Sequence, residues 1–285
     1  MRKEILLSDP ILKCPVCGLP LTPNDNGKSL VCENEQKKHC FDISSAGYVN
    51  LVTGNKSGDS RGDAKEMVRA RSAFLERGYY APFADAIVAA AERYGAQKIA
   101  DAGCGEGYYT NRIAKLDGAR VYGFDISKHA TEHAAKSAKR AGVADNTFYA
   151  AASIFEMPLA DGSVDTVVNL FAPCAEAEFS RILCDGGYLI CGTAGKKHLI
   201  DLKRAIYDTA YENDERADIP ESFEFIEKIN VNYSFTVDNN ADLQSLFAMT
   251  PYYFRTSERD REKLVHIDRL DITADFDILV FKKGN

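Results

Sequence analysis

The sequence contains 285 residues, which is long enough for one large domain or for a domain with a small additional module. Hydrophobic residues make up 45% of the chain, enough for a buried core, and no run of 18 apolar residues occurs, so we expect no membrane span. The formal net charge of −7 argues against a protein that is basic over its whole surface, so any contact with nucleic acid must depend on a local patch. The N-terminus lacks the long apolar segment of a signal peptide, and we therefore expect a cytoplasmic location.

The first 40 residues are rich in potential metal ligands. They contain four of the eight cysteines of the chain: Cys14, Cys17, Cys32 and Cys40. In a cytoplasmic chain such a cluster favours a metal site over disulfides, and the two-residue spacer of "CPVC" lets both thiolates reach one ion. The segment that follows predicts a hairpin with its turn at Asn26-Gly27. Residues 1–52 are therefore predicted to form a zinc ribbon, in which the ion compensates for a small core.

The sequence leaves two candidates for the fourth zinc ligand. A structural zinc ion takes four ligands, and Cys14, Cys17 and Cys32 supply three of them. His39 and Cys40 are adjacent, so their side chains point in different directions on an extended chain. Only one of the two is therefore expected to bind the ion.

A polar stretch follows the ribbon. Residues 53–63 are rich in Gly, Ser, Asp and Lys and predict a flexible connection. We place a linker at residues 53–75 and a second, larger domain at residues 76–285. Apolar residues at helical spacing predict helices at 64–78 and 80–95, each of which ends at a glycine, as helices often do.

From residue 98 onward, segments with a strand pattern alternate with segments with a helix pattern. Strands are predicted at residues 98–103, 120–125, 147–153, 164–171 and 187–194. Helices are predicted at residues 109–116, 127–142 and 175–183. This alternation is typical of βαβ units and predicts an α/β fold with a mostly parallel, Rossmann-like sheet. Ligands of such sheets bind beyond the carboxyl ends of the strands.

The segment "DAGCGEG", at the end of the first of these strands, predicts a ligand site. Its three glycines are Gly103, Gly105 and Gly107. This Gly-x-Gly-x-Gly turn differs from the dinucleotide motif and from the Walker A loop, and it holds no basic residue for a pyrophosphate. Asp101 precedes the turn, and Asp125 ends the next strand, where a carboxylate suits the hydroxyl groups of a ribose. The pattern predicts a nucleoside with a cationic tail, and S-adenosylmethionine fits, with its adenine near Ser153 and Ile154.

Several segments, read together, resemble those of one family. They are "CPVCG" (14–18), "HCFDISSAGYVNL" (39–51), "EMVRAR" (66–71), "DAGCGEGYYT" (101–110), "FAPC" (171–174) and "MTPYYFR" (249–255). In this order, and over nearly the whole chain, they resemble the bacterial 23S ribosomal RNA (guanine-N1)-methyltransferases. The resemblance implies a class I methyltransferase fold, in which a seven-stranded sheet ends in an antiparallel strand, here at residues 271–284. It also implies S-adenosylmethionine and zinc as cofactors and a hairpin of 23S ribosomal RNA as the partner.

The same resemblance implies roles for particular residues. It favours His39 as the fourth zinc ligand, with Cys40 as the alternative. Four residues match family positions that contact the methyl donor: Tyr80, Gly105, Glu106 and His198. The full set predicted to bind the donor is Tyr80, Asp101, Gly103, Gly105, Glu106, Asp125, Ile126, Ser153 and His198.

The acceptor site is expected after the fourth strand of the sheet. Methyl transfer to N1 of guanine is an in-line displacement that depends on positioning, and N1 must lose its proton before or during transfer. Asn169 is expected to bond the edge of the base, and Phe171 to stack on it. Glu176 is the nearest acid and a candidate proton acceptor, with capping of the helix that it begins as the favoured alternative.

The substrate expected from this chemistry is a hairpin or a single strand, because N1 is buried in paired RNA. Basic residues predicted to hold phosphates are Lys56, Arg61, Lys65, Arg69, Arg71 and those of residues 195–204. Two other functions are weighed: a small-molecule methyltransferase, which the zinc ribbon disfavours, and a non-catalytic zinc-ribbon RNA-binding protein, which the intact Asp101 and Asp125 disfavour. A homodimer is compatible with the sequence, which does not fix the oligomeric state.

Overall fold

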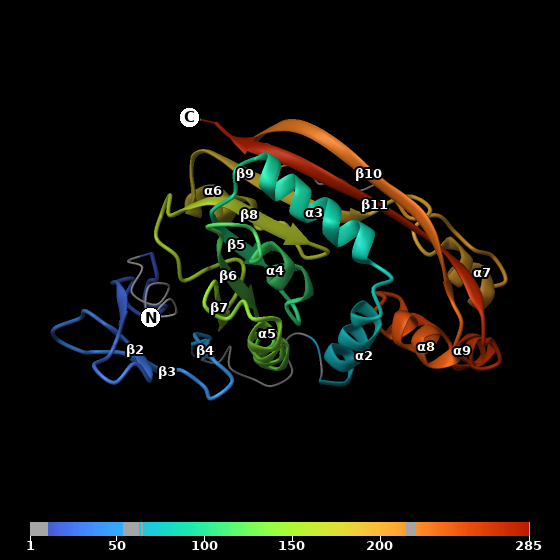
Figure 1. Ribbon diagram of the computed structural model, residues 1–285, viewed down its shortest axis with the longest axis horizontal. Helices are drawn as coiled ribbons and strands as arrows, with labels where there is room; N and C mark the ends of the chain where they lie inside the picture. Colours follow the sequence, from blue (N-terminus) through green and yellow to red (C-terminus); the bar gives the residue numbers. More distant parts are fainter. Residues whose placement is uncertain (1–10, 54–62, 64, 215–219, 285) are drawn as a thin grey trace.

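The computed structural model describes residues 11–53, 63, 65–214 and 220–284. They form a small three-stranded sheet near the N-terminus and an eight-stranded sheet with helices packed against it (Figure 1). The α/β fold predicted from the sequence, a Rossmann-like methyltransferase sheet with an N-terminal zinc ribbon, is confirmed.

The large sheet combines parallel and antiparallel pairing. Its strands follow the order β10 (Phe223–Val237), β11 (Leu270–Lys283), β9 (Leu183–Ala194), β8 (Val164–Leu170), β5 (Lys98–Ala102), β6 (Arg120–Asp125), β7 (Thr147–Ala151) and β4 (Tyr48–Asn50). Neighbours from β9 to β4 run parallel, whereas β11 is antiparallel to β9 and β10, as the resemblance implied. The sheet has eight strands and not the expected seven, because β4 adds to the edge of β7. Its three residues are too few to give a strand pattern in the sequence.

Helices connect the strands and cover the sheet. They are α2 (Lys65–Glu76), α3 (Ala81–Arg93), α4 (Tyr108–Ile113), α5 (Lys128–Ala141), α6 (Glu176–Ile182), α7 (Ile200–Ile206), α8 (Asn240–Ala248) and α9 (Glu258–Val265), with a 3₁₀ helix η2 (Tyr253–Arg255). In the part of the chain that the structure describes, none of the helices is long and apolar enough to span a membrane. Ser127 caps the start of α5 by accepting a hydrogen bond from the backbone N–H of Ala130, and Gly142 ends it with a φ angle of 72°.

Alternate residues of the strands contribute to two hydrophobic cores on opposite faces of the sheet. Ile99, Val121 and Val168 belong to a core that contains side chains of α3, α4 and α5. Their sequence neighbours, such as Ala100 and Tyr122, belong to a second core that contains side chains of α6 and of the ribbon. This is the side-chain alternation expected of strands that are buried on both faces.

The zinc ribbon packs directly on the large sheet. Its strands are β1 (Leu21–Pro23), β2 (Ser29–Cys32) and β3 (Cys40–Asp42), which pair in this order. Leu12 is fully buried in the second core. On either side of it, the N–H of Lys13 donates to the carbonyl of Pro158 (3.0 Å), and the N–H of Ala160 donates to the carbonyl of Ile11 (2.7 Å). The ribbon therefore shares a core with the larger domain.

The connection between the ribbon and the larger domain contains a helix. The helix predicted at residues 64–78 is α2, which packs against α5 and α8. Most of the polar stretch at 53–63, including Lys56 and Arg61, lies outside the described residues. The domain limits at residues 52 and 76 stay a prediction.

Replacement of Leu12 tests whether the ribbon is part of the common core. Leu12 is fully buried, whereas Leu19, in the same ribbon, is 40% exposed. We expect Leu12→Ala to lower the free energy of unfolding by about 2–5 kcal/mol through the cavity that it leaves, and Leu19→Ala by less than about 0.5 kcal/mol. Denaturant unfolding of the two variants measures both values. Equal stability of the two variants would contradict a shared core.

Candidate active site and zinc site

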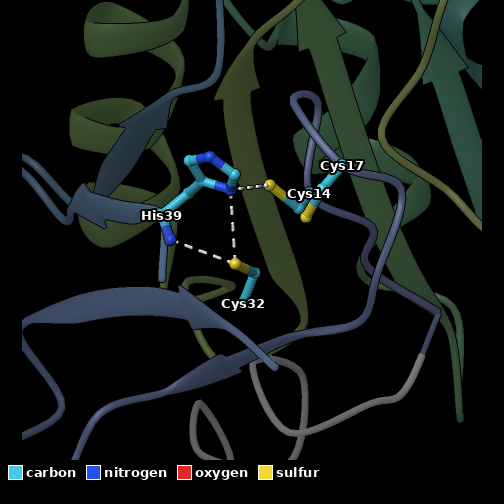
Figure 2. A group of neighbouring side chains, drawn as sticks. All are labelled: Cys14, Cys17, Cys32 and His39. Atoms are coloured by element: carbon cyan, nitrogen blue, oxygen red, sulfur yellow. Dashed lines mark hydrogen bonds between the residues drawn. The ribbon is translucent and has the colours of Figure 1, made fainter. Parts of the chain in front are cut away.

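Four side chains of the ribbon come together in a metal-binding arrangement (Figure 2). They are Cys14, Cys17, Cys32 and His39, and their ligand atoms lie within 4.8 Å of one another. The Nδ1 atom of His39 is 3.5 Å from Sγ of Cys14 and 3.4 Å from Sγ of Cys32. Ligands that surround a tetrahedral zinc ion at about 2.0–2.3 Å stand roughly 3.3–3.8 Å apart, so this donor set fits zinc.

Backbone hydrogen bonds place these ligands. The N–H of Gly18 donates to the carbonyl of Cys14 (2.8 Å) and closes the turn that also carries Cys17. Cys32 ends β2, and its Sγ accepts a hydrogen bond from the backbone N–H of His39 (3.1 Å). Burial alone would raise the pKa of Cys32, but hydrogen bonds, first of all from the backbone of His39, lower this pKa to about 6. The lowered pKa favours the thiolate form, which is the form that binds zinc.

The arrangement favours His39 over Cys40 as the fourth ligand. Cys40 begins β3, and its side chain is exposed and does not belong to the gathered group. This agrees with the expectation that only one of the two adjacent residues binds the ion.

Substitution of each candidate distinguishes the fourth ligand. We expect about one zinc ion per chain in the wild-type protein and in Cys40→Ser, and loss of zinc from His39→Ala, because only three ligands remain there. Elemental analysis of protein purified without chelators measures the zinc content. The opposite pattern, with zinc kept by His39→Ala and lost from Cys40→Ser, would overturn the assignment.

A large cleft opens at the carboxyl ends of the parallel strands. Its volume is about 1330 Å³, and it is lined by the β5–α4 turn, the ends of β6, β7, β8 and β9, and parts of residues 207–214 and 249–255. The residues predicted to bind the donor all line this cleft: Tyr80, Asp101, Gly103, Gly105, Glu106, Asp125, Ile126, Ser153 and His198. Folding thus brings together side chains that are far apart in the sequence.

The glycine turn between β5 and α4 requires residues without side chains. Gly103 and Gly107 have φ angles of 87° and 85°, in the left-handed region that favours glycine. A Cβ atom on Gly103 would lie 2.6 Å from Cβ of Ala172, and one on Gly107 would lie 2.8 Å from Cβ of Ala134. The turn therefore packs closely against the β8–α6 loop and against α5.

Buried carboxylates surround this turn. Asp101 accepts a hydrogen bond from Oγ1 of Thr110 (2.5 Å), and burial raises the pKa of Asp101 to about 7. Asp125 accepts hydrogen bonds from the backbone N–H groups of Gly105 (3.0 Å) and Ser127 (2.8 Å), and burial raises its pKa despite them. Carboxylates that are buried close together favour a cationic ligand, because its charge stabilises their ionised forms.

Glu106 is a third carboxyl group beside the turn, and one of its oxygens lacks a hydrogen-bond partner among the described residues. Glu106 is 5% exposed, and among the described residues its Oε2 atom has no hydrogen-bond partner. Nη1 of Arg71 is 3.7 Å away, and burial raises the pKa of Glu106 although this arginine opposes the shift. The amino and sulfonium groups of S-adenosylmethionine carry the positive charge that these carboxylates favour, so the residues present fit the donor.

Arg71 faces the donor site, which the sequence did not reveal. Its guanidinium group lines the cleft and pairs with Asp63 as well as with Glu106, so the geometry gives no support to the prediction that it holds phosphates. The carbonyl of Asp63 accepts a hydrogen bond from Oγ of Ser127 (2.9 Å), which ties the segment before α2 to the loop after β6. The "EMVRAR" segment was one of the motifs that resemble the family, but the sequence does not show with which side chain a charged helical residue such as Arg71 pairs.

Tyr80 and His198 form a pair across the cleft wall. Oη of Tyr80 lies 3.3 Å from Nε2 of His198. The backbone N–H of Asp275 donates to Nδ1 of the histidine (3.3 Å), so the ring hydrogen is on Nε2 and points toward Tyr80. Burial lowers the pKa of His198 to about 3, so the imidazole is neutral. The hydroxyl group of Tyr80 therefore accepts this hydrogen bond.

Two residues with strained backbones line the cleft. Phe171 and Leu199, with φ angles of 55° and 58°, are the non-glycine residues with positive φ in the described part of the chain. Such conformations cost on the order of 1–3 kcal/mol and persist where the surrounding structure imposes them, often at functional sites. Leu199 follows His198 directly, and the ring of Phe171 is 50% exposed.

The structure separates the three residues predicted to act on the base. Asn169 is 4% exposed, and its amide donates to the carbonyl of Ala102 (3.0 Å), so it holds the β8–α6 loop instead of facing a ligand. Glu176 lies outside the cleft, where it accepts hydrogen bonds from the N–H (2.6 Å) and Oγ (2.5 Å) of Ser222. Of the three, only Phe171 lines the cleft. The geometry therefore gives no support to a base contact by Asn169 or Glu176.

The fold and the site together define the class of the protein. A parallel sheet with one antiparallel strand near its edge, a glycine turn after a central strand and carboxylates at adjacent strand ends are the features of a class I S-adenosylmethionine-dependent methyltransferase. The bound donor supplies an electrophilic methyl group on a positively charged sulfur. The ribbon adds a zinc site to this fold.

Comparisons with known proteins identify the family. Residues 95–245 match the methyltransferase domain family, and residues 12–56 match the RlmA N-terminal zinc ribbon. The chain is 34% identical over 212 residues to the 23S rRNA (guanine(748)-N(1))-methyltransferase of Streptomyces fradiae. This match covers 72% of this chain and 70% of the relative. It is 31% identical over 288 residues to a Bacillus subtilis protein with the provisional name 23S rRNA (guanine-N(1)-)-methyltransferase. This match covers 96% of this chain and 97% of the relative. The chain belongs to the 23S rRNA (guanine-N1)-methyltransferase family.

The raised pKa of Asp101 predicts that donor binding depends on pH. Below about pH 7 this carboxyl group gains a proton in the free protein and loses the negative charge that favours a cationic ligand. We expect the dissociation constant of S-adenosylmethionine to rise on the order of tenfold from about pH 7.5 to about pH 6, as linkage to one proton requires. In Asp101→Asn the binding should be weak at both pH values, which calorimetry measures. A wild-type constant that stays the same would contradict the role of Asp101.

Proposed function

We propose that this chain transfers a methyl group from S-adenosylmethionine to N1 of a guanine in a hairpin loop of 23S ribosomal RNA. The observation that carries this proposal is a single cleft that contains both the buried carboxylates and the exposed ring of Phe171. The residue after Phe171, Ala172, leaves no room for a side chain on Gly103, so the donor turn and the loop for the acceptor are in contact. The reaction in the names of the relatives supports the same chemistry.

The order of the strands suggests how the donor is held. Asp125, at the end of β6, takes the ribose hydroxyl groups, because a carboxylate at the second strand end suits a diol. Asp101 and Glu106 take the cationic amino-acid end beside the glycine turn. Ser153, with Ile126, contacts the adenine at the ends of β6 and β7. These roles use the residues that line the cleft.

The acceptor is held by stacking in this proposal. Phe171 presents an exposed ring next to the donor turn and stacks on the guanine, while Asn169 fixes the loop from behind. Hydrogen bonds from Ser222 lower the pKa of Glu176 and hold its carboxylate at the start of α6, which favours a structural role for Glu176 over proton transfer. Precise placement of N1 against the methyl group supplies much of the rate enhancement.

The RNA partner contacts the ribbon and the rim of the cleft in this proposal. Lys196 and Lys197 are exposed between β9 and α7 and are suited to phosphates, whereas Lys203, on α7, is buried. An unpaired loop presents N1 without the cost of opening a base pair. A cytoplasmic location goes with this substrate, and a homodimer is compatible with it.

Two other functions make different demands on the molecule. Transfer of a methyl group to a small molecule does not require a zinc ribbon, whereas this chain has one packed in the core of the sheet. A non-catalytic RNA-binding protein has no use for buried carboxylates around a donor turn, which are unfavourable without a cationic ligand.

Nucleoside mass spectrometry of 23S ribosomal RNA tests the reaction. We expect N1-methylguanosine to be lost when the gene is deleted and to return with the wild-type gene or with Glu176→Gln. Asp125→Ala should restore far less, because loss of a charge-assisted hydrogen bond worth roughly 1.5–3 kcal/mol weakens donor binding on the order of tenfold to a hundredfold. Unchanged N1-methylguanosine in the deletion strain would overturn the proposed function.

A further inference from the structure

An inserted segment forms one wall of the cleft. β10 and β11 are antiparallel neighbours whose register ends at the pair Val237 and Leu270, so a turn of a few residues would suffice to join them. Instead residues 238–269 intervene and form α8, η2 and α9, and α8 packs against α2 beyond the ends of the two strands (Figure 1). The residues of this insertion that line the cleft all belong to the "MTPYYFR" segment (249–255), to which the donor site assigns no role.

Exposed aromatic side chains are concentrated in the cleft. Nine large hydrophobic side chains of the described residues are exposed: Val16, Leu19, Phe155, Phe171, Tyr211, Phe225, Ile226, Phe254 and Val265. Four of them, all aromatic, line the cleft: Phe155, Phe171, Tyr211 and Phe254. Phe254, at 67%, is the most exposed of the nine. Because exposed apolar surface is unfavourable, its concentration in one cleft indicates a ligand that covers these rings.

The insertion holds Phe254 in place. The neighbouring Tyr253 packs against Phe247 with ring centroids 5.1 Å apart, and its carbonyl accepts a hydrogen bond from Nη2 of Arg261 (2.5 Å). Oγ1 of Thr256, the residue after η2, is 2.6 Å from Oη of Tyr207, which follows α7. The exposed ring of Phe254 therefore extends from an anchored turn.

Tyr211 is fixed in a similar way by a buried lysine. Lys203 is 1% exposed, and its ammonium group donates to the carbonyl of Tyr211 (3.1 Å) and to Oδ1 of Asn213 (2.6 Å). The same Nζ atom lies 4.2 Å from the centroid of the Tyr211 ring. The amide of Asn213 donates in turn to the carbonyls of Gly195 (2.8 Å) and His198 (3.2 Å), so the Tyr211 segment is joined to the donor site.

We propose that Tyr211 and Phe254 form a stacking subsite for unpaired RNA bases on the acceptor side of the cleft. Aromatic rings bind bases without regard to sequence, because every base has a π face. Phe171, next to the glycine turn, receives the target guanine, and the two outer rings hold the bases beside it in the loop. The exposed Arg255, in the same wall, is suited to the phosphate between them. This inference rests on the proposed function, because it assigns the rings to the RNA that is methylated.

Alanine variants of the two rings test the subsite against a matched control. Phe254→Ala and Tyr211→Ala remove rings inside the cleft, whereas Phe225→Ala removes an exposed ring of β10 that lies outside it. The assay measures methylation of an unmodified 23S ribosomal RNA transcript by the full-length protein, and calorimetry measures S-adenosylmethionine binding. We expect kcat/KM for the RNA to fall roughly fivefold to a hundredfold in each cleft variant, with unchanged donor affinity. Phe225→Ala should match the wild type, and Tyr211→Phe should restore activity, since it keeps the ring.

Three outcomes would overturn the subsite: wild-type kcat/KM in both cleft variants, an equal loss in Phe225→Ala, or weakened donor binding in the cleft variants. The product nucleoside of the wild-type protein is identified in the same assay. If the wild type methylates this RNA at an atom other than guanine N1, the proposed function fails, while the contrast between the cleft variants and Phe225→Ala still decides the subsite. If the wild type methylates no RNA, the proposed function and the subsite both fail.

Discussion

The close approach of two loops at Gly103 is the constraint on which the active site depends. The β5–α4 turn carries Glu106 and directly follows Asp101 of β5, and the β8–α6 loop carries Phe171. The two segments meet where a Cβ on Gly103 would lie 2.6 Å from Cβ of Ala172. Only a residue without a side chain lets these loops pack at this distance. The strained φ of Phe171 belongs to the same contact region, and its ring is held at the surface of the cleft beside the donor turn. In the proposed function, this backbone packing brings the donor and the acceptor together.

The charge of the cleft explains how an acidic protein can act on RNA. Asp101 and Glu106 are buried and Asp125 is half-buried, and one arginine, Arg71, pairs with Glu106 and with Asp63. These carboxylates line the cleft, where their negative charge suits a donor that is positively charged. This charge would repel phosphates, so the proposed RNA contact relies on the exposed aromatic rings that line the same cleft. The net charge of −7 therefore says little about the surface that meets RNA.

The ribbon shares its core with the larger domain, although the sequence predicted a separate module joined by a linker. Leu12 and Leu21 are buried in the same core as Tyr122 and Phe124 of the sheet, and β4 extends the sheet itself. A small domain with a metal site gains stability from such burial, since its own core is limited. The zinc ligands are consequently held at a fixed position relative to the sheet.

The sequence by itself determined the features that depend on local pattern. The spacing of the cysteines, the alternation of strands and helices, and the glycine turn with Asp101 and Asp125 predicted the zinc ribbon, the α/β sheet and the turn that lines the cleft, whereas Tyr80 and His198 were predicted only from the family resemblance. Only the tertiary structure decided which side chains meet across long separations. It gathered His39 and not Cys40 with the other ligands, brought Tyr80 to His198, turned Arg71 toward Glu106, and engaged Asn169 and Glu176 away from the cleft. Periodicity and turn chemistry are encoded over a few residues, whereas the partner of a polar side chain is set by the packing of segments that lie far apart in the chain.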